Sequence, residues 1–572
     1  INRDVSSLFS RTENWTPYLF GMAAMLALAA SCSENELGES GGTGANENGP
    51  HYATFTIKLP TTNGTRADGE PTYDDGTADE YAVGNATLLV FEKAAADPET
   101  DATLVEKQEL GDMKPWNKVD DDPNAITTEA NITAKLNNFK PSNEKNYYAV
   151  VLLNNNITTS STKVTVPAVN QKFGEWQKAQ VSNKITDKTN GFYMANAVKV
   201  NASTGATETL VLIDKDKVTT TESAAQPAAT IHVERGVAKV TMTTFSQMNV
   251  EGIDGDKVTI TAWDLDVTNK KSYPVHNVNN FDGFTDYWGR VWSESRFTSG
   301  HTAFNRAHWG IDPNYSTLNI HDQHTDEFDY KASDYNFSGA GEATRPKYCL
   351  ENTFSLGCMC QNQTTRVILK AKYVPSGWTA GTTFYMIDGK SGYFTEATLK
   401  TQIETAITNA GYTAADFKVS LNALKDAGKH IVAAGDITKE SGTQDVDATF
   451  LNKVNAQLGL SGEKKISTYK EGVSYYIARI KHFGDGLTPW PATDGNKETY
   501  GTGEDAKKRY LGRYGVVRNN WYELTVNKVT NPGSPDVPTV NPDTPDDEGD
   551  KYYVNCTVKI LSWAKRVQHI EL

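Results

Sequence analysis

The sequence predicts an all-β protein with minor helical insertions, built as two tandem antiparallel β-sandwich domains. Its 572 residues are several times the ~150 residues of an average domain, so more than one core is expected. Short β-rich segments recur between clusters of Asn, Gly, Asp, Pro and Thr, a pattern typical of sandwiches. The predicted strands cover residues 86–91, 147–153, 229–242, 257–267, 366–374, 473–480 and 521–529.

Two helices are predicted in the second half of the chain. Over residues 395–410, Leu399, Ile403 and Ile407 recur at helical spacing, and Gly411 marks the end. A second helix is predicted over residues 447–458. No alternation of strands and helices surrounds these segments, so we expect insertions between strands and not the crossovers of a parallel sheet.

The charge of the chain argues against nucleic acid as a partner. Lys and Arg number 56 against 71 Asp and Glu, which gives a formal net charge of −15. Proteins that bind phosphate backbones have a positive electrostatic potential at the binding surface, and the net charge of this chain is negative. Five cysteines in a chain of this length do not indicate a disulfide scaffold.

The N-terminal segment has the pattern of a secretory signal. An apolar run over residues 18–31 follows Arg3 and Arg11 and is short of the ~20 residues that a membrane-spanning helix needs. The small residues directly before Cys32 resemble a bacterial lipobox. We therefore expect a lipoprotein signal peptide over residues 1–31 and lipidation, as with palmitate, at Cys32; an ordinary signal peptide or a short core helix are the alternatives.

A strand followed by an exposed loop comes next, after a polar tether over residues 33–49. Over residues 53–59, apolar side chains alternate with the polar side chains of Thr54, Thr56 and Lys58, which indicates a half-buried strand. The apolar face consists of Ala53, Phe55, Ile57 and Leu59. In the following loop, residues 61–76, Arg66 is the only basic residue. Exposed polar loops of this kind are preferred sites of proteolysis.

The C-terminus carries a strand on a long linker. Residues 531–550 hold five prolines among acidic residues, a composition that gives an extended linker. The apolar residues of the segment that follows are Val554, Cys556, Val558, Ile560 and, just beyond, Trp563. An isolated strand satisfies neither its backbone groups nor its apolar face. It must pair with the parent chain or with another molecule, and the sequence leaves both open.

Several segments in this order resemble the fimbrillins of Bacteroidales type V pili, and most closely their minor-fimbrillin branch. The segments are LPTTNGTRADG (59–69), YYAVVLLN (147–154), GFYMAN (191–196), VERGVAKV (233–240), WDLDVTNKKSY (263–273), YKEGVSYY (469–476) and VRNNWYELTV (517–526). Regions 280–345 and 395–465 lie outside this resemblance.

The resemblance implies assembly by strand exchange. A maturation protease would cut between Arg66 and Ala67, the strand with Phe55 would leave, and the C-terminal segment of a neighbouring subunit would replace it. The implied organisation is a propeptide over 32–66, sandwich domains over 67–245 and 246–529, a linker over 530–550 and a donor strand over 551–572. The implied function is a pilus shaft subunit for surface adhesion, which polymerises with its own copies and other fimbrial subunits after reaching the outer membrane as a lipoprotein precursor.

Enzymatic interpretations are not favoured, and no cofactor is expected. Ser40 lies in a Gly-x-Ser-x-Gly pattern, but the tether around it lacks the strand and helix of a nucleophile elbow. Gly389-Lys-Ser391 lacks the leading glycine of a phosphate loop, because position 384 is Phe384. Residues 321–329, with His301 and His308, offer metal-type ligands but more often form a solvated loop. Cys349, Cys358 and Cys360 lack paired Cys-x-x-Cys spacing, so a disulfide or buried thiols are expected there.

A surface-anchored glycan-binding lipoprotein is the alternative from another class. Tyr287, Trp288, Trp292 and Trp309 form an aromatic-rich region that would serve for ring stacking on sugars. Aromatic side chains more often pack in cores and interfaces, and this is the interpretation we favour.

Overall fold

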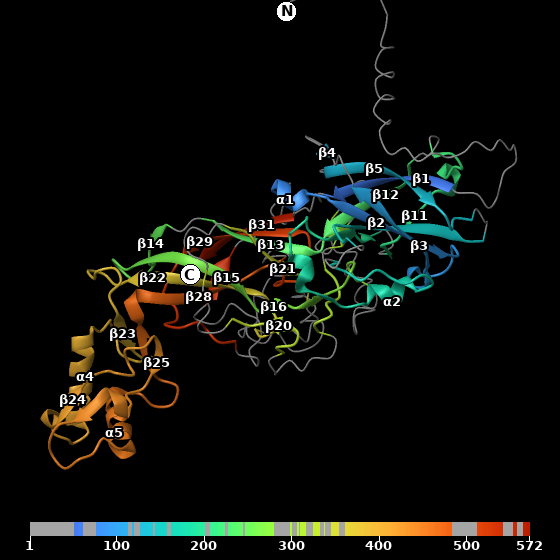
Figure 1. Ribbon diagram of the computed structural model, residues 1–572. Coiled ribbons are helices and arrows are strands. Elements are labelled where there is room, and N and C mark those ends of the chain that lie inside the picture. The colour runs from blue at the N-terminus through green and yellow to red at the C-terminus, as the bar shows by residue number, and fades with distance from the viewer. Residues whose placement is uncertain are drawn as a thin grey trace, which may run out of the picture. The chain divides into compact units, whose positions relative to one another are not determined.

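The computed structural model describes only part of the chain. The described residues are 51–60, 76–112, 117–118, 126–140, 144–156, 162–200, 206–222, 227–243, 246–278, 298–299, 306–307, 309–315, 324–331, 337, 345–353, 361–482, 512–540, 553–556 and 564–571. They form mostly strands with a few helices (Figure 1), which confirms the predicted all-β class.

The first sheet comes from the N-terminal half of the chain. Its nine strands are β1 (His51–Pro60), β2 (Asn85–Lys93), β3 (Thr103–Asp112), β4 (Asn117–Lys118), β5 (Ile126–Leu136), β6 (Asn146–Leu153), β8 (Met194–Asn196), β11 (Val211–Leu212) and β12 (Pro227–Arg235). Their order is β3-β2-β6-β8-β12-β1-β5-β4, and β11 pairs with β6.

This sheet curls into two layers around a shared core. Phe55 and Ile57 of β1 belong to the same buried cluster as Leu88 of β2 and Val151 of β6, although β1 and β2 are separated by three strands in the sheet. The opposite face of β2 and β6 packs in a second buried cluster, which includes Phe173 and Trp176 of the short helix α2 (Phe173–Gln177). The result is a two-layered sandwich, in which β1 is a central strand whose apolar face lies in the core.

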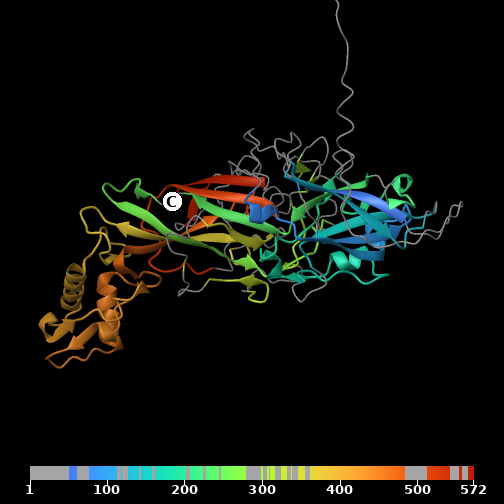
Figure 2. The same cartoon turned by 45° about the horizontal axis from the view of Figure 1, so that its top comes forward.

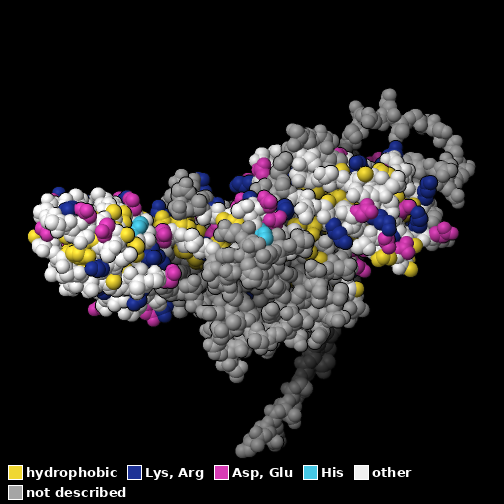
Figure 3. Space-filling model, turned by 90° about the horizontal axis from the view of Figure 1, so that it is seen from below, with side chains coloured by type: hydrophobic (Ala, Val, Ile, Leu, Met, Phe, Trp, Pro, Cys, Tyr) yellow, Lys and Arg dark blue, Asp and Glu magenta, His cyan; other side chains and the backbone are white. Residues whose placement is uncertain are grey.

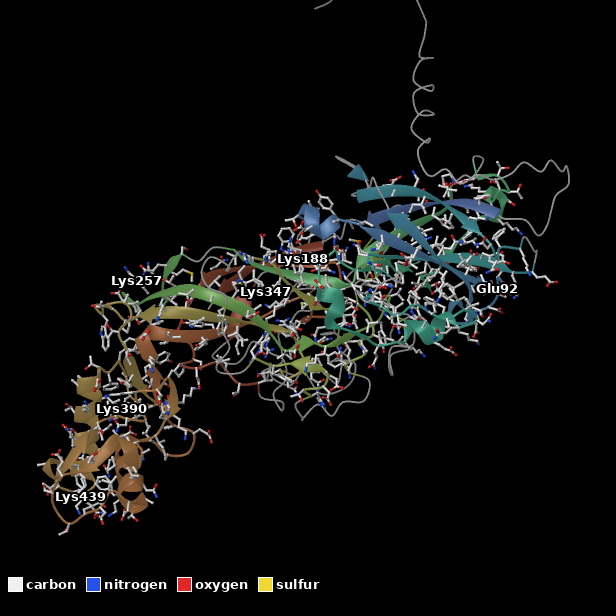
Figure 4. The ribbon with its side chains drawn as sticks, in the orientation of Figure 1. Glu92, Lys188, Lys257, Lys347, Lys390 and Lys439 are labelled. Carbon is white, nitrogen blue, oxygen red and sulfur yellow. The ribbon has the colours of Figure 1, made fainter. Side chains whose placement is uncertain are left out.

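The second sheet also forms a sandwich with two layers. Its strands are β13 (Val237–Thr243), β14 (Gln247–Asn249), β15 (Lys257–Asp266), β21 (Lys347–Leu350), β22 (Arg366–Val374), β28 (Val473–Arg479), β29 (Asn520–Lys528), β30 (Tyr553–Cys556) and β31 (Ala564–Glu571). The order is β14-β15-β22-β28-β30-β31-β29-β13-β21. One buried cluster joins side chains of β13 and β29 to those of β15 and β22. An ion pair of 3.0 Å between Lys347 Nζ of β21 and Asp264 Oδ1 of β15 also joins these layers (Figure 4).

The chain changes sheet at Gly236. The sequence predicted one strand over 229–242, but the structure has β12 in the first sheet and β13 in the second. A Cβ at position 236 would lie 3.1 Å from Cδ1 of Tyr193 and 3.2 Å from Cδ1 of Ile185, so a glycine fits this crossing closely. The apolar pattern continues through Gly236, which is why periodicity alone predicted an unbroken strand.

Residues 384–469 form an insert with its own core, and both predicted helices lie in it (Figure 1). Helix α4 (Glu396–Asn409) begins after Thr395, whose side chain accepts from the Thr398 N–H, and α5 (Ala448–Leu458) begins after Asp447. The other elements are β23 (Phe384–Ile387), β24 (Phe417–Val419), β25 (Gly428–His430), β26 (Ile437–Lys439) and β27 (Ile466–Tyr469). The helices are insertions between β22 and β28, as predicted. In Figure 3, charged side chains of both signs are interspersed over the insert.

Small sheets and turns complete the described structure. β7 (Val181–Ser182) pairs with β17 (Lys271–Ser272), β16 (Thr268–Asn269) with β20 (Phe328–Asp329), and β9 (Lys199–Val200) with β10 (Thr207–Glu208) and β19 (Arg306–Ala307), which also pairs with β18 (Thr298–Ser299). Helix α1 covers Ala78–Tyr81. Short 3₁₀ turns are Glu99–Asp101, Asn183–Thr186, Lys215–Lys217, Ala414–Asp416, Ala434–Asp436 and Lys470–Gly472.

Asp312 makes the stability of the chain depend on pH. Its carboxylate is buried and accepts from N–H groups of Asn314, Asn269 and Thr353, yet burial outweighs these donors and raises its pKa to about 7. The folded chain therefore binds a proton that the unfolded chain releases between about pH 4 and 7. The unfolding free energy should rise as the pH falls through this range. We expect the melting temperature to gain more between pH 8 and 5 in the wild type than in Asp312→Asn, measured by calorimetry; equal gains would contradict this assignment.

Candidate functional site

β1 lies in the middle of the first sheet and pairs on both edges. It runs parallel to β12 with five paired positions and antiparallel to β5 with ten. Figure 1 shows this strand among β12, β5 and β2. The strand therefore has the pairing of a central strand, although it comes first in the described chain.

The apolar face of β1 is buried as predicted for three of its four residues. Ala53, Phe55 and Ile57 have no exposed surface, and the side chain of Leu59 is outside the described residues. Burial of a large apolar side chain contributes about 1.5–3 kcal/mol, so Phe55 and Ile57 together contribute about 3–6 kcal/mol. Removing β1 would expose this strip of core together with the unpaired edges of two strands.

The opposite face of β1 bonds to β5 through side chains. The hydroxyl oxygens of Thr54 and Thr133 are 2.9 Å apart, and the Thr56 hydroxyl donates to Oδ1 of Asn131 at 2.6 Å. At the start of the strand, backbone bonds of 2.6 and 2.9 Å join Tyr52 and Thr219. All of these contacts are non-covalent.

The loop after β1 contains the predicted cleavage site. Residues 61–75, including Arg66 and Ala67, lie outside the described residues, and the description resumes at Gly76. β1 is joined to the rest of its sheet along the chain through this loop alone. A cut within it would leave β1 held by pairing and packing only.

The chain after the loop is anchored independently of β1. Glu80 of α1 is fully buried, and its Oε1 lies 2.7 Å from Nζ of Lys239 on β13. Its carboxylate also accepts from the Tyr348 hydroxyl, at 2.5 Å. Burial raises the pKa of Glu80, but the Lys239 ammonium and these hydrogen bonds outweigh it, so the pKa is lowered overall. Residues from Glu80 onward would therefore stay in place after a cut in the loop.

The C-terminal segment pairs within the parent chain in this structure. β30 is parallel to β28 at two positions, and β31 is parallel to β29 at eight. In the strand order, the two tail strands connect the two layers of the second sheet. Figure 2 shows red C-terminal strands beside green strands of this sheet. Val554 and Cys556 lie in β30, whereas Val558, Ile560 and Trp563 lie outside the described residues. The sequence left open whether the tail pairs with its own chain or with another molecule. In this structure it pairs with its own chain.

The first part of the linker is fixed to β28. Backbone N–H groups of Tyr475 and Ser534 donate to each other's carbonyl oxygens at 2.8 Å. The hydroxyls of Tyr469 and Tyr476 donate to the carbonyls of Gly533 and Asn531 at 2.8 Å. Farther on, the Arg366 guanidinium donates to the Pro538 carbonyl at 2.8 Å. A tail that leaves β28 and β29 would thus pivot after Pro538.

Other candidates from the sequence are placed as follows. Cys32, Ser40, His301, His308 and His321 lie outside the described residues. Among the residues that the structure describes, no group of three His, Cys, Asp or Glu side chains is arranged to hold a metal ion. No helix in the same described ranges is long and apolar enough to cross a membrane. Gly389 adopts a positive φ in the turn after β23.

Trp309 and Cys349 are buried, and they bear on the glycan-binding hypothesis and on the expected state of the cysteines. Trp309 is fully buried, with its ring centroid 5.7 Å from that of His482, so it offers no platform for a sugar. Tyr287, Trp288 and Trp292 are outside the described residues. Cys349 is a buried free thiol, and burial raises its pKa to about 12. Cys358 and Cys360 are not among the described residues.

Comparison with known families decides the identity of the C-terminal region. Residues 467–569 match the family described as major fimbrial subunit protein type IV, fimbrillin, C-terminal. This range includes β28, β29 and most of the paired tail. The C-terminal region is that of a fimbrillin. No curated protein matches its sequence.

Solved structures similar to this chain come from Parabacteroides and Bacteroides species. A fimbrial assembly protein from Parabacteroides distasonis is 12% identical, with a TM-score of 0.26 over 57% of this chain and 84% of that one. A candidate cell adhesion protein from the same species is 11% identical, with a TM-score of 0.30 over 91% and 99%. One from Bacteroides eggerthii is 14% identical, with a TM-score of 0.24 over 58% and 79%.

The structure adds residues that the sequence analysis missed. Pattern reasoning placed Thr54 and Thr56 on the opposite face of β1 but did not predict that their side chains bond to β5. It also missed Glu80, because a buried carboxylate in a polar segment gives no periodic signal. The Lys239 residue that pairs with Glu80 lies in the quoted VERGVAKV segment, but its partner is 159 residues away in sequence.

Proposed function

We propose that the whole chain is a fimbrillin and serves as a pilus shaft subunit, which assembles by exchange of β1 for the C-terminal strand of a neighbouring copy. The observation that carries the proposal is the position of β1. It fills the centre of a sheet and a core, yet one loop alone connects it to the remainder of its sandwich along the chain. Such a strand is replaceable by another strand of similar pattern without unfolding the sandwich.

The tail has the properties of the replacing strand. It carries Val554, Cys556, Val558 and Ile560 at the same two-residue spacing as the apolar face of β1. Residues 539–552 lie between the docked Pro538 and β30, and at roughly 3.1 Å per residue a Pro-rich segment of this length spans roughly 40 Å. This reach supports pairing with a second molecule.

The contact between subunits is head-to-tail. The acceptor slot, between β12 and β5, and the donor tail are different surfaces of one chain, so each added copy offers a new free end. Assembly therefore gives a filament and not a closed dimer. The tail gives up its pairing with β28 and β29 in the parent chain and gains a slot that offers two strand edges and an apolar core.

The route to the cell surface follows from the N-terminal segment. We infer export as a lipoprotein anchored through Cys32 in the outer membrane, and release of residues 32–66 by an arginine-specific protease at Arg66. The mature subunit would then reside in the surface fimbrium, with adhesion as its role and with its own copies and other fimbrial subunits as partners. The proposal assigns no catalytic role and no cofactor to the chain.

Substitution of Arg66 tests the maturation step. We expect assembled wild-type fibres to contain subunits that begin at Ala67, whereas Arg66→Ala subunits keep the propeptide and stay out of fibres, because β1 remains tethered. The measurement is N-terminal mass spectrometry of surface-extracted protein. Thr65→Ala is the matched control and should mature normally. Fibres built from Arg66→Ala subunits that begin at Cys32 would refute the proposed cleavage.

A further inference from the structure

A carboxylate on β3 holds the end of β5, the strand that forms one wall of the β1 slot. Glu106 is 6% exposed. Its Oε1 and Oε2 lie 3.0 and 2.9 Å from the backbone N of Asn137, and Oε2 lies 3.0 Å from the backbone N of Asn138. The Asn137 side-chain amide donates to Oε1 at 2.9 Å. One carboxylate thus binds the two residues that directly follow β5.

Neighbouring bonds strengthen this junction between β3 and β5. The side-chain amide of Asn138 donates to the Val105 carbonyl at 2.9 Å. The side-chain amide of Gln108 donates both to the Lys135 carbonyl and to Oε1 of Glu106. Donors converge on the carboxylate from the two residues after β5 and from its own strand. Hydrogen bonds to a charged acceptor are stronger than neutral ones.

The junction matters most when β1 is absent. Within the described residues, β5 pairs with β1 at ten positions and with β4 at two. Loss of β1 would leave β5 with the short β4 pairing, the side-chain packing of Ala134 and Leu136, and the Glu106 junction. An acceptor slot keeps its width only if β5 stays in place while the slot is empty.

We infer that Glu106 is a positioning residue that holds β5 as the fixed wall of the slot between departure of β1 and arrival of the incoming strand. The inference rests on the proposed function for the nature of that strand. The hydrogen bonds of Glu106 go to Asn137, Asn138 and Gln108 and not to β12 or β1. It acts through the backbone of residues 137 and 138, at the end of the wall.

The test uses the full chain with a recognition sequence for a site-specific protease inserted in the 61–75 loop. After cleavage, the fragment that contains β1 is removed by size exclusion in mild urea, and the urea is dialysed away. Hydrogen exchange of residues 130–136 is followed by mass spectrometry, before and after cleavage. The cleaved protein is diluted until light scattering shows only monomers, so that the tail of a neighbouring copy does not fill the slot. Binding of a labelled synthetic peptide of residues 551–572 is then measured on these monomers.

In Glu106→Gln, an amide N–H₂ replaces one acceptor oxygen and faces the donors of residues 137 and 138. Before cleavage, β1 still holds β5, so we expect exchange like that of the wild type. After cleavage, we expect exchange in β5 to be faster by about tenfold or more and peptide affinity to fall by about tenfold or more, the loss for a charged hydrogen bond. Glu109→Gln is the matched control, because Glu109 accepts from Thr87 of β2 and not from β5; it should match the wild type throughout.

The two measurements separate the two claims. If β5 exchanges equally fast in cleaved wild type and cleaved Glu106→Gln, Glu106 does not hold the wall and the inference is overturned. Faster β5 exchange in Glu106→Gln already before cleavage would also overturn the inference, because it would show that Glu106 has a general structural role. If the cleaved wild type fails to bind the peptide, the strand-exchange proposal fails, while the exchange data still decide the role of Glu106.

Discussion

Chains that lack residues 551–572 are expected to remain folded monomers and to form no polymers. The described side chains of the buried cluster in the second sandwich come from strands and turns that precede the tail, so we expect this core to survive the deletion. The edges of β28 and β29 lose their pairing with β30 and β31, and we expect a lower melting temperature as a result. Polymerisation is lost because no donor strand remains.

Size-exclusion chromatography with light scattering measures this effect after cleavage of the 61–75 loop. The wild type should give concentration-dependent ladders of polymers, and the deletion a single monomer peak. A variant whose residues 541–550 are replaced by a Gly/Ser linker of equal length is the matched control, because it keeps the tail and the maximum extension of the linker. Polymers that persist in the deletion variant would show that assembly uses another surface.

A disulfide across β1 and β5 is expected to block assembly reversibly. The hydroxyl oxygens of Thr54 and Thr133 are 2.9 Å apart at paired positions, so cysteines there fit the short Cβ separation of a disulfide. In the oxidised Thr54→Cys/Thr133→Cys chain, β1 stays in its slot even after the loop is cut. Polymer yield should fall to background and recover when dithiothreitol is added.

The single variants Thr54→Cys and Thr133→Cys control for the substitutions themselves. Each loses the contact between the two hydroxyls without gaining a bond, so each should polymerise in oxidising and reducing buffer alike. Equal polymer yield from the oxidised and reduced double variant would mean that β1 does not have to leave. That result would leave the slot between β12 and β5 without a role in assembly.

Much of the fold could be predicted because alternating apolar residues report directly on burial. The strand at His51–Pro60 and the helices α4 and α5 were found within a residue or two. Strand direction and sheet membership leave no such pattern. Periodicity therefore did not show that β1 is parallel to β12, or that the segment around Gly236 passes from one sheet to the other.

The candidate site could be predicted only in part, for the same physical reason. The apolar face of β1 is periodic and was found. Polar side chains that fix the site act through partners far away in sequence, as Glu106 does with Asn137, and no local pattern marks them. The pairing of the tail with β28 and β29 was one of two outcomes that the sequence allowed, because an alternating strand specifies a face and not a partner.

The structure of a native fibre tests the central claim most directly. Strand exchange predicts that the slot between β12 and β5 is filled by residues 551–572 of the adjacent subunit, with β1 absent. A fibre in which each subunit keeps its own β1 in that slot, and its own tail on β28 and β29, would contradict the account.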